Sequence, residues 1–164
     1  MSEHRYLVAL GSNQRSSRYG APRAVIAAAV DGIGELGTVE AISPLIETPP
    51  VGPSSRRYVN GALLLASDHA PRELLAGLQE VEARLGRERR GQRWRSRTID
   101  LDIILWNGGS VSDVALQIPH PLFRERDFVL GPAVSVAPNW RDPVTALTVK
   151  QLYARLTRNR PAYR

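Results

Sequence analysis

The 164-residue sequence contains no cysteine and only one lysine, Lys150, among its 22 basic residues. Without cysteine, the chain cannot form disulfide bonds or thiolate metal sites, and it cannot use a cysteine nucleophile. No apolar run is long enough to cross a bilayer as a helix, and the apolar stretch Tyr6–Leu10 is too short for a signal peptide. We therefore expect a protein of the cytoplasm with no membrane partner.

Several common catalytic motifs are also missing. There is no GxxxxGK[ST] loop of the Walker type, no GxSxG motif and no protein-kinase signature set. What is present is a composition of 43% hydrophobic and 23% charged residues, which is typical of a soluble globular protein. The length suits one domain, and no repeat or linker divides it, so we expect a single domain over residues 1–164.

Arginine supplies almost all of the positive charge. The net charge is +6, and six arginines fall in the stretch RERRGQRWRSR, residues 87–97. A bias in genome composition would also enrich arginine, but its planar guanidinium suits bidentate binding of phosphate. The stretch predicts binding of a polyanion, such as a nucleotide, a nucleic acid or a phosphorylated metabolite. The alternatives are a solvated charged loop, or a nucleic-acid patch on which Trp94 stacks.

Hydrophobic periodicity and turn residues predict the order of helices and strands. Strands are expected at residues 5–10, 38–47 (interrupted by Pro44), 58–66, 98–105 and near 114–118, and helices at 22–36, 71–86, 127–137 and 148–157. The first six of the longer elements follow the order β-α-β-β-α-β, which is that of a ferredoxin-like α+β domain. The last two helices would form a C-terminal helical extension.

The stretch RSRTIDLDIIL, residues 95–105, places two aspartates in a predicted strand. With a period of two residues, Asp100 and Asp102 project from one face, and their Cα atoms lie roughly 6–7 Å apart. Aspartate is depleted in strands, and two carboxylates on one face repel each other unless a cation lies between them. Mg²⁺ prefers such hard oxygen ligands. The alternative is a solvent-facing strand with ordinary surface charges.

Tyr58 and Asn60 share a face of the strand that follows a Pro/Gly-rich loop. An aromatic ring beside a carboxamide can stack on a flat heterocycle and read its edge, and Phe128 could supply the opposite wall. Alternatively, Tyr58 and Phe128 are core residues, and Asn60 satisfies a nearby backbone group.

Two further groups are candidates for contact with a nucleotide. Gln79 and Glu82 lie three residues apart on one helix face, from which they could reach a ribose or an adenine edge. His120 is held between Pro119 and Pro121, and it could donate a hydrogen bond to a phosphate oxygen. As alternatives, the first two are surface residues and His120 is a structural turn residue.

Taken together, these segments resemble the 6-hydroxymethyl-7,8-dihydropterin pyrophosphokinase family of folate biosynthesis. The matching segments, in chain order, are LGSN (10–13), TPPVGP (48–53), YVN (58–60), the helix with Gln79 and Glu82, GRERRGQRWRSRTIDLDII (86–104) and PHPLFRERDFVL (119–130). The resemblance implies a ferredoxin-like enzyme that transfers the β,γ-diphosphate of ATP to the hydroxymethyl group of the pterin and releases AMP. It also implies two Mg²⁺ ions and a monomer that has no nucleic-acid partner.

The resemblance assigns roles by matched position. Asp100 and Asp102 would ligate Mg²⁺, and Trp94 would help to close the arginine-rich loop over the site. The remaining catalytic residues would be Arg87, Arg89 and Arg97. ATP would be contacted by Gln79, Glu82, Arg89, Arg97, Ile103, His120 and Arg126. The pterin would be contacted by Thr48, Val51, Tyr58, Asn60 and Phe128.

Two loops depart from the family pattern. The segment 14–22 looks longer than usual and is followed by Arg23, and the link between Gly52 and Tyr58 carries Arg56 and Arg57. These changes affect substrate affinity and loop closure rather than the chemistry. Two competing interpretations use the same residues: an RNA-binding module on a ferredoxin-like sheet, and a nuclease that uses the aspartates to hold its metal.

Overall fold

The computed structural model describes residues 3–13, 19–48, 58–86 and 98–158. The predicted roles of five residues lie outside these ranges: Val51, Arg87, Arg89, Trp94 and Arg97. No helix within the described ranges is long and apolar enough to span a membrane.

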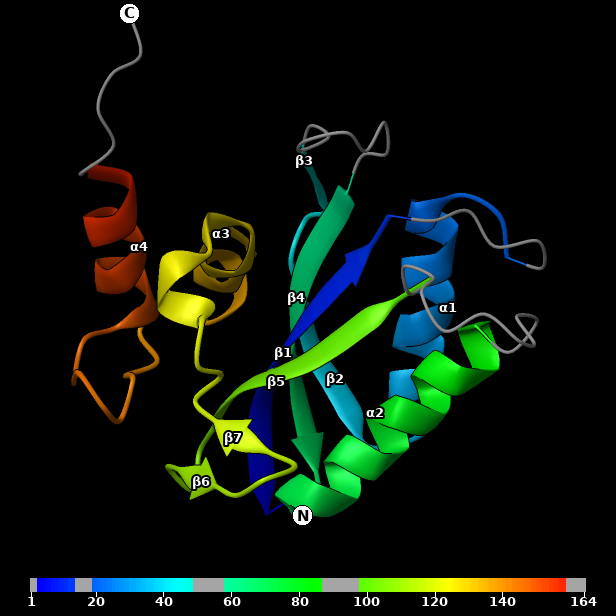
Figure 1. Cartoon of the computed structure of the whole chain (residues 1–164), viewed down its shortest axis with the longest axis horizontal. Coiled ribbons are helices and arrows are strands. Elements are labelled where there is room, and N and C mark those ends of the chain that lie inside the picture. Colours follow the sequence, from blue (N-terminus) through cyan, green and yellow to red (C-terminus); the bar gives the residue numbers. More distant parts are fainter. Residues whose placement is uncertain (1–2, 14–18, 49–57, 87–97, 159–164) are drawn as a thin grey trace, which may run out of the picture.

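The chain forms a mixed structure of helices and antiparallel strands (Figure 1). The strands are β1 (His4–Ser12), β2 (Thr38–Ile42), β3 (Ile46–Thr48), β4 (Tyr58–Ser67), β5 (Asp100–Trp106), β6 (Val111–Ser112) and β7 (Gln117–Ile118). The helices are α1 (Pro22–Ile33), α2 (Pro71–Gly86), the short 3₁₀ helix η1 (Phe123–Glu125), α3 (Asp127–Val136) and α4 (Val149–Arg158).

The main sheet has the order β2-β4-β1-β5, with β3 also paired to β4, and all of these pairings are antiparallel. The two longest strands, β1 and β4, lie at its centre. Strand β5, which carries the two aspartates, lies at one edge of the sheet. A separate hairpin is formed by β6 and β7.

Helices cover both faces of this sheet (Figure 1). On one face, Tyr6, Val8 and Leu101 pack into a core with residues of α1 and α2. On the other face, Leu7, Ala9 and Ala62 pack into a second core with residues of η1, α3 and α4. The alternation of side chains along β1 therefore supplies both cores, as the period of two requires.

The predicted helices and strands are confirmed, with shifts at their ends. The predicted strand 38–47 is interrupted at Pro44 as expected and forms the two strands β2 and β3. Just before the break, the Ser43 hydroxyl accepts a hydrogen bond from the Ala62 N–H at 2.9 Å. The prediction of one strand near 114–118 is wrong in extent: β6 and β7 flank a turn there. The Asp113 carboxylate accepts a hydrogen bond from the Ala115 N–H at 2.7 Å and so stabilises this turn.

Candidate active site

The strand register places the two aspartates beside the predicted pterin residues. Across the sheet, Asp100 pairs with Gly11 of β1, and Gly11 pairs with Asn60 of β4. Two residues further along the strands, Asp102 pairs with Ala9, and Ala9 pairs with Ala62. Since neighbouring strands are about 4.8 Å apart, Asp100 and Asn60 lie roughly 10 Å from each other on one face.

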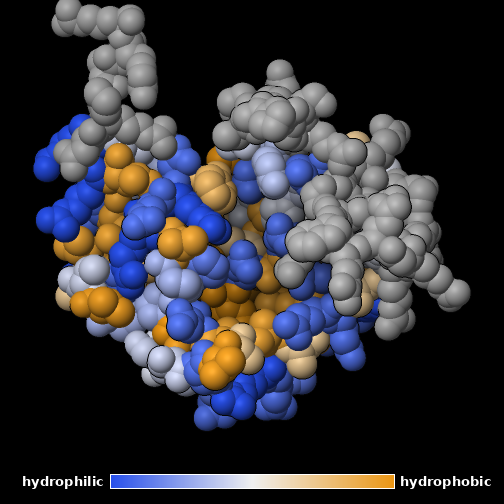
Figure 2. Space-filling view, viewed as in Figure 1, coloured by the Kyte–Doolittle hydropathy of each residue, from blue (hydrophilic) through white to orange (hydrophobic). Residues whose placement is uncertain are grey.

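The small residues of β1 leave space above the sheet. Ala9 and Gly11 lie between the aspartates and Asn60, and a cavity of about 710 Å³ opens over them. Its lining residues are Ala9, Leu10, Gly11, Thr48, Tyr58, Asn60, Asp100, Asp102, Arg126, Asp127, Phe128 and Val129. Figure 2 shows hydrophobic side chains gathered near the middle of this face, with hydrophilic ones around them. Such a mixture of flat apolar walls and a few polar groups is typical of small-molecule sites.

The donor set at the aspartate end fits Mg²⁺. Both carboxylates are half-buried and line the cavity, and hard oxygen ligands are those that Mg²⁺ prefers. Within the described ranges, no group of three or more His, Cys, Asp or Glu side chains could hold a metal ion by itself. Mg²⁺ commonly binds one or two carboxylates and completes its octahedron with water and substrate phosphates, so two aspartates are sufficient.

The predicted aromatic walls belong to the cavity and not to the core. Tyr58 and Phe128 are 40% and 37% exposed, so the alternative that they are core residues is wrong. Asn60 is only 6% exposed and lines the same cavity. The guanidinium carbon of Arg126 lies 5.6 Å from the centre of the Phe128 ring, which places a cation at the same wall.

Four of the predicted ATP residues within the described ranges do not line this cavity: Gln79, Glu82, Ile103 and His120. Ile103 is 4% exposed and its side chain lies in the core beneath α1 and α2. Gln79 is an exposed residue of α2, and Glu82 is half-buried on the same helix. The Oε2 atom of Glu82 accepts a hydrogen bond from the Leu101 N–H at 3.1 Å. Glu82 therefore joins α2 to the outer edge of β5.

His120 lies near the other end of the same edge. Its backbone N–H donates to the Ile104 carbonyl at 3.1 Å, and its Nδ1 accepts from the Leu122 N–H at 3.2 Å. Burial lowers the pKa of His120; Asp102 raises this pKa and Arg126 lowers it. The imidazole is therefore neutral near pH 7. Because Nδ1 is an acceptor, the ring proton is on Nε2, which is then the donor available to a ligand.

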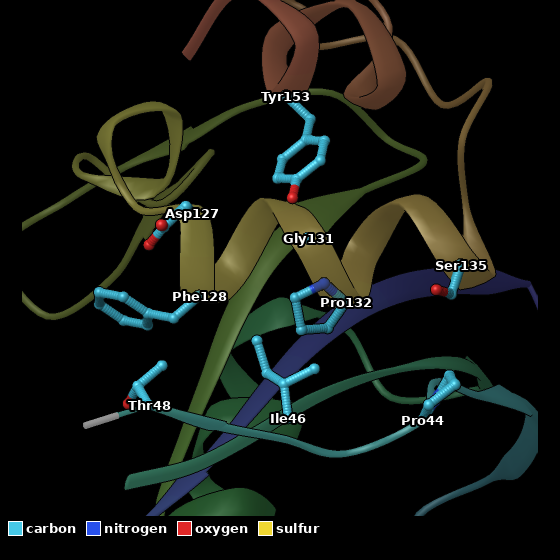
Figure 3. Close-up of a pocket in the computed structure, with 9 residues that line it drawn as sticks. All are labelled: Pro44, Ile46, Thr48, Asp127, Phe128, Gly131, Pro132, Ser135 and Tyr153. Atoms are coloured by element: carbon cyan, nitrogen blue, oxygen red, sulfur yellow. The ribbon is translucent and has the colours of Figure 1, made fainter. Parts of the chain in front are cut away.

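The sequence did not identify Ala9, Gly11 and Asp127 as cavity residues. Their signal was weak, because small residues are common in strands at helix-covered faces, and an acidic residue is common in the first turn of a helix. Asp127 also lines a second cavity of about 360 Å³, shown in Figure 3, between β3 and α3. In this view, Phe128 and Thr48 lie at one end of the second cavity, and both also line the first.

The family model for 7,8-dihydro-6-hydroxymethylpterin-pyrophosphokinase (HPPK) matches residues 7–138. A 2-amino-4-hydroxy-6-hydroxymethyldihydropteridine pyrophosphokinase of Pseudomonas aeruginosa is 40% identical over 142 residues, which cover 85% of this chain and 84% of the relative. A protein of the same name from Methylorubrum extorquens is 33% identical over 155 residues, which cover 93% of each chain.

Solved structures show the same fold. An HPPK-DHPS triple mutant of Plasmodium falciparum superposes with a TM-score of 0.71 over 93% of this chain, at 14% sequence identity. The wild-type protein with pteroate gives a TM-score of 0.69. The present chain spans 44% of each of these longer chains. At this identity the likeness concerns the fold alone.

Proposed function

The chain belongs to the 7,8-dihydro-6-hydroxymethylpterin-pyrophosphokinase family, and on that premise we propose how the cavity above β1 carries out its reaction. The enzyme is a 2-amino-4-hydroxy-6-hydroxymethyldihydropteridine pyrophosphokinase of folate biosynthesis. It transfers the β,γ-diphosphate of ATP to the hydroxymethyl group of 6-hydroxymethyl-7,8-dihydropterin and releases AMP. The proposed mechanism rests on the cross-strand pairing of Asp100 with Gly11 and of Gly11 with Asn60. This pairing gives one cavity an acidic end, with Asp100 and Asp102, and a heterocycle end, with the proposed pterin residues.

At the acidic end, Asp100 and Asp102 hold Mg²⁺, and we propose two ions. When bound, Mg²⁺ neutralises charge on the phosphate oxygens during transfer. The two carboxylates fix where that positive charge is placed, because β5 is held on both sides. On one side β5 pairs with β1, and on the other the Leu101 N–H donates a hydrogen bond to Glu82. Arg126 lies on the cavity lining and adds a cation between the phosphates and the pterin. Positioning and electrostatics then supply most of the rate, since phosphoryl transfer needs little covalent help from the protein.

We propose that ATP lies along the outer edge of β5. At this edge the Leu101 N–H donates a hydrogen bond to the Glu82 carboxylate, and the Ile104 carbonyl accepts one from the His120 N–H. Ile103 lies between these two contacts, and with a period of two its backbone N–H points outward as that of Leu101 does. Since the Ile103 side chain is buried, its contact with ATP is through the backbone. Gln79 and the Nε2–H of His120 would contact the nucleotide on either side.

At the heterocycle end, Tyr58 and Phe128 sandwich the pterin ring. Asn60 is buried beside them and offers both a donor and an acceptor to the ring edge. Thr48 lies opposite Tyr58 in the β3–β4 pairing and adds a polar group at the same place. We propose that Val51 contributes through its backbone, although it falls outside the described residues.

The arginine-rich segment 87–97 completes the proposal. Arg87, Arg89 and Arg97 would bind the phosphates, and Trp94 would help to exclude water. These roles come from family membership and the sequence, because the segment lies outside the described residues. Water exclusion would strengthen every charge interaction in the site.

We further propose a ferredoxin-like sheet with a C-terminal helical extension. The strand order β2-β4-β1-β5 and the helices α3 and α4 support this description. We also propose that residues 1–164 act as one domain, as a monomer and in the cytoplasm, on ATP and the pterin rather than on nucleic acid. The two contiguous cores on either side of one sheet support the single domain.

The test is product analysis by chromatography after the protein is mixed with Mg²⁺, ATP and 6-hydroxymethyl-7,8-dihydropterin. We expect AMP and pterin diphosphate in equal amounts, and no products when EDTA removes the metal. ADP in place of AMP would mean transfer of the γ-phosphate alone and would contradict the proposed reaction. Turnover that persists in EDTA would contradict the proposed role of the aspartates.

A further inference from the structure

Three proposed substrate residues, His120, Arg126 and Phe128, come from one short segment that runs from the end of β7 into the first turn of α3. This segment has little local support at its helix starts. The cap residue of η1 is Leu122 and that of α3 is Arg126, and neither makes a side-chain capping hydrogen bond. The backbone of the segment is joined to β5 at His120, whose N–H donates to the Ile104 carbonyl, but the two helix starts need a further contact.

That further contact is an ion pair with a residue 18 positions along the chain. The Nε of Arg124 donates to Oδ2 of Asp142 at 2.5 Å, and one terminal nitrogen of Arg124 donates to Oδ1 at 2.8 Å. This is a bidentate pair between η1 and the turn that precedes α4. The Arg124 guanidinium carbon also lies 4.7 Å from the centre of the Phe123 ring, and Phe123 is fully buried.

Asp142 is itself held firmly. Its side chain is 0% exposed, and its two oxygens also accept hydrogen bonds from the Val144 N–H at 3.1 Å and the Thr145 hydroxyl at 2.7 Å. Its backbone N–H donates to the Leu147 carbonyl at 2.8 Å. The carboxylate is thus a fixed point supported by its own turn, and the guanidinium of Arg124 fits onto it in one orientation.

A pair of this kind orients the backbone more than it adds stability. Replacing a buried ion pair by apolar residues of similar size is often neutral for stability, while removing one partner leaves a buried charge unpaired. The bidentate geometry fixes both the distance and the direction of Arg124. Arg126 is two residues further along the chain and Phe128 four residues, so a shift at Arg124 would move both of them at the cavity wall.

We propose that Arg124 and Asp142 are positioning residues, which hold the segment 120–128 so that Arg126 and Phe128 face the substrate cavity. This inference rests on the proposed function for its catalytic consequence. It makes the turn before α4 part of the active-site support, although that turn does not line the cavity. Neither Arg124 nor Asp142 is expected to touch substrate.

The test compares Asp142→Asn, Arg124→Met and Arg124→Lys with the wild type. In Asp142→Asn we expect KM for both ATP and the pterin to rise about tenfold, because a displaced wall affects both substrates. Arg124→Met should behave similarly. Arg124→Lys keeps the charge and one hydrogen bond, so it should recover part of the affinity. Asp113→Asn is the matched control, since Asp113 pairs with Arg72 at a surface away from the cavity.

A second control separates positioning from general loss of stability. Ile33→Ala weakens the core on the opposite face of the sheet, and it should lower the melting temperature without changing either KM below that temperature. A rise in KM in Ile33→Ala equal to that in Asp142→Asn would overturn the proposal. Unchanged KM values in both Asp142→Asn and Arg124→Met would also overturn it.

Amide hydrogen exchange provides a measurement that needs no substrate. In Asp142→Asn we expect faster exchange at residues 122–130 and unchanged exchange in β1 and β4. Exchange that is equally fast throughout the chain, or unchanged at 122–130, would contradict the positioning role. This result is independent of the reaction, whereas a failure of the wild type to produce AMP would contradict the proposed function alone.

Discussion

Gly11 faces Asn60 across the β1–β4 pairing, and a Cβ atom on Gly11 would lie 3.2 Å from the Asn60 Oδ1 atom. The absence of a side chain at Gly11 therefore sets where the Asn60 carboxamide lies. Since Gly11 also pairs with Asp100, this one residue separates the proposed pterin contact from the proposed metal ligands. The glycine of the LGSN segment thus has a steric role on the cavity lining.

Gly11→Ala is expected to weaken pterin binding. The new methyl group must push the Asn60 carboxamide away by a few tenths of an ångström, and Asn60 is too buried to move freely. We expect KM for the pterin to rise severalfold and KM for ATP to change much less. Steady-state kinetics with each substrate varied in turn would measure this.

The matched control is Gly32→Ala. Its Cβ would lie 3.1 Å from Val81 between α1 and α2, so the crowding is similar but lies on the opposite face of the sheet. This variant should keep both KM values. A rise in KM for ATP that equals the rise for the pterin in Gly11→Ala would contradict the assignment of Asn60 to the pterin.

Asp102→Asn is expected to abolish turnover. The substitution keeps the size of the side chain but removes a negative charge that Mg²⁺ requires at this position. We expect at least about a hundredfold loss of kcat, together with a weaker dependence of ATP binding on Mg²⁺. Calorimetric titration with and without Mg²⁺ would measure the binding. Asp68→Asn, at the far end of β4, serves as the control, and near-normal turnover in Asp102→Asn would contradict the metal assignment.

Glu82→Ala is expected to affect both stability and turnover. It removes the acceptor of the Leu101 N–H at the edge of β5, and an unsatisfied backbone donor costs about 1–3 kcal/mol where it is buried. The adjacent Asp100 and Asp102 would lose part of their support. Urea unfolding and kcat would measure these two effects.

Glu82→Gln distinguishes the backbone contact from the charge. Its amide oxygen can still accept the Leu101 N–H, so stability should return close to the wild-type value. Glu80→Ala, an exposed neighbour on α2, should change neither property. If Glu82→Gln is as unstable as Glu82→Ala, then the hydrogen bond to Leu101 is not what Glu82 contributes.

Much of the fold could be predicted because local signals agreed with each other. Pro22 and Pro71 mark the first residues of α1 and α2, and alternation along β1 and β5 identifies the strands. Pro44 marked the split between β2 and β3, but the contact between Ser43 and Ala62 at that split could not be predicted. A contact across the sheet leaves no periodic signal in the sequence.

The candidate site shows the same limit. A period of two residues was sufficient to put Asp100 and Asp102 on one face. The same period puts the Ile103 side chain on the opposite face, where it is buried in the core. The sequence did not reveal that the Glu82 carboxylate accepts a hydrogen bond from the edge of β5. Nor could it pair Arg124 with Asp142, since the two lie 18 positions apart and Asp142 belongs to none of the matching segments. Such facts depend on how the elements pack.

Asp142 should make the stability of the protein depend on pH below about 4. Burial alone would raise the pKa of this carboxyl group, but hydrogen bonds from Arg124, Thr145 and Val144 and the charge of Arg124 outweigh burial and lower the pKa from 3.8 to about 2. The unfolded chain therefore binds more protons than the folded protein between these two values. The free energy of unfolding must fall as the pH falls through this window.

The size of this effect can be isolated by comparison with Asp142→Asn, because the other carboxyl groups titrate in both proteins. Above pH 4 the wild type should be the more stable, and the difference should shrink by about 2 kcal/mol as the pH falls to 2. Urea unfolding at several pH values between 5 and 2 would measure it. A difference in stability that stays constant over that range would mean that the ionised carboxylate of Asp142 is not what holds Arg124.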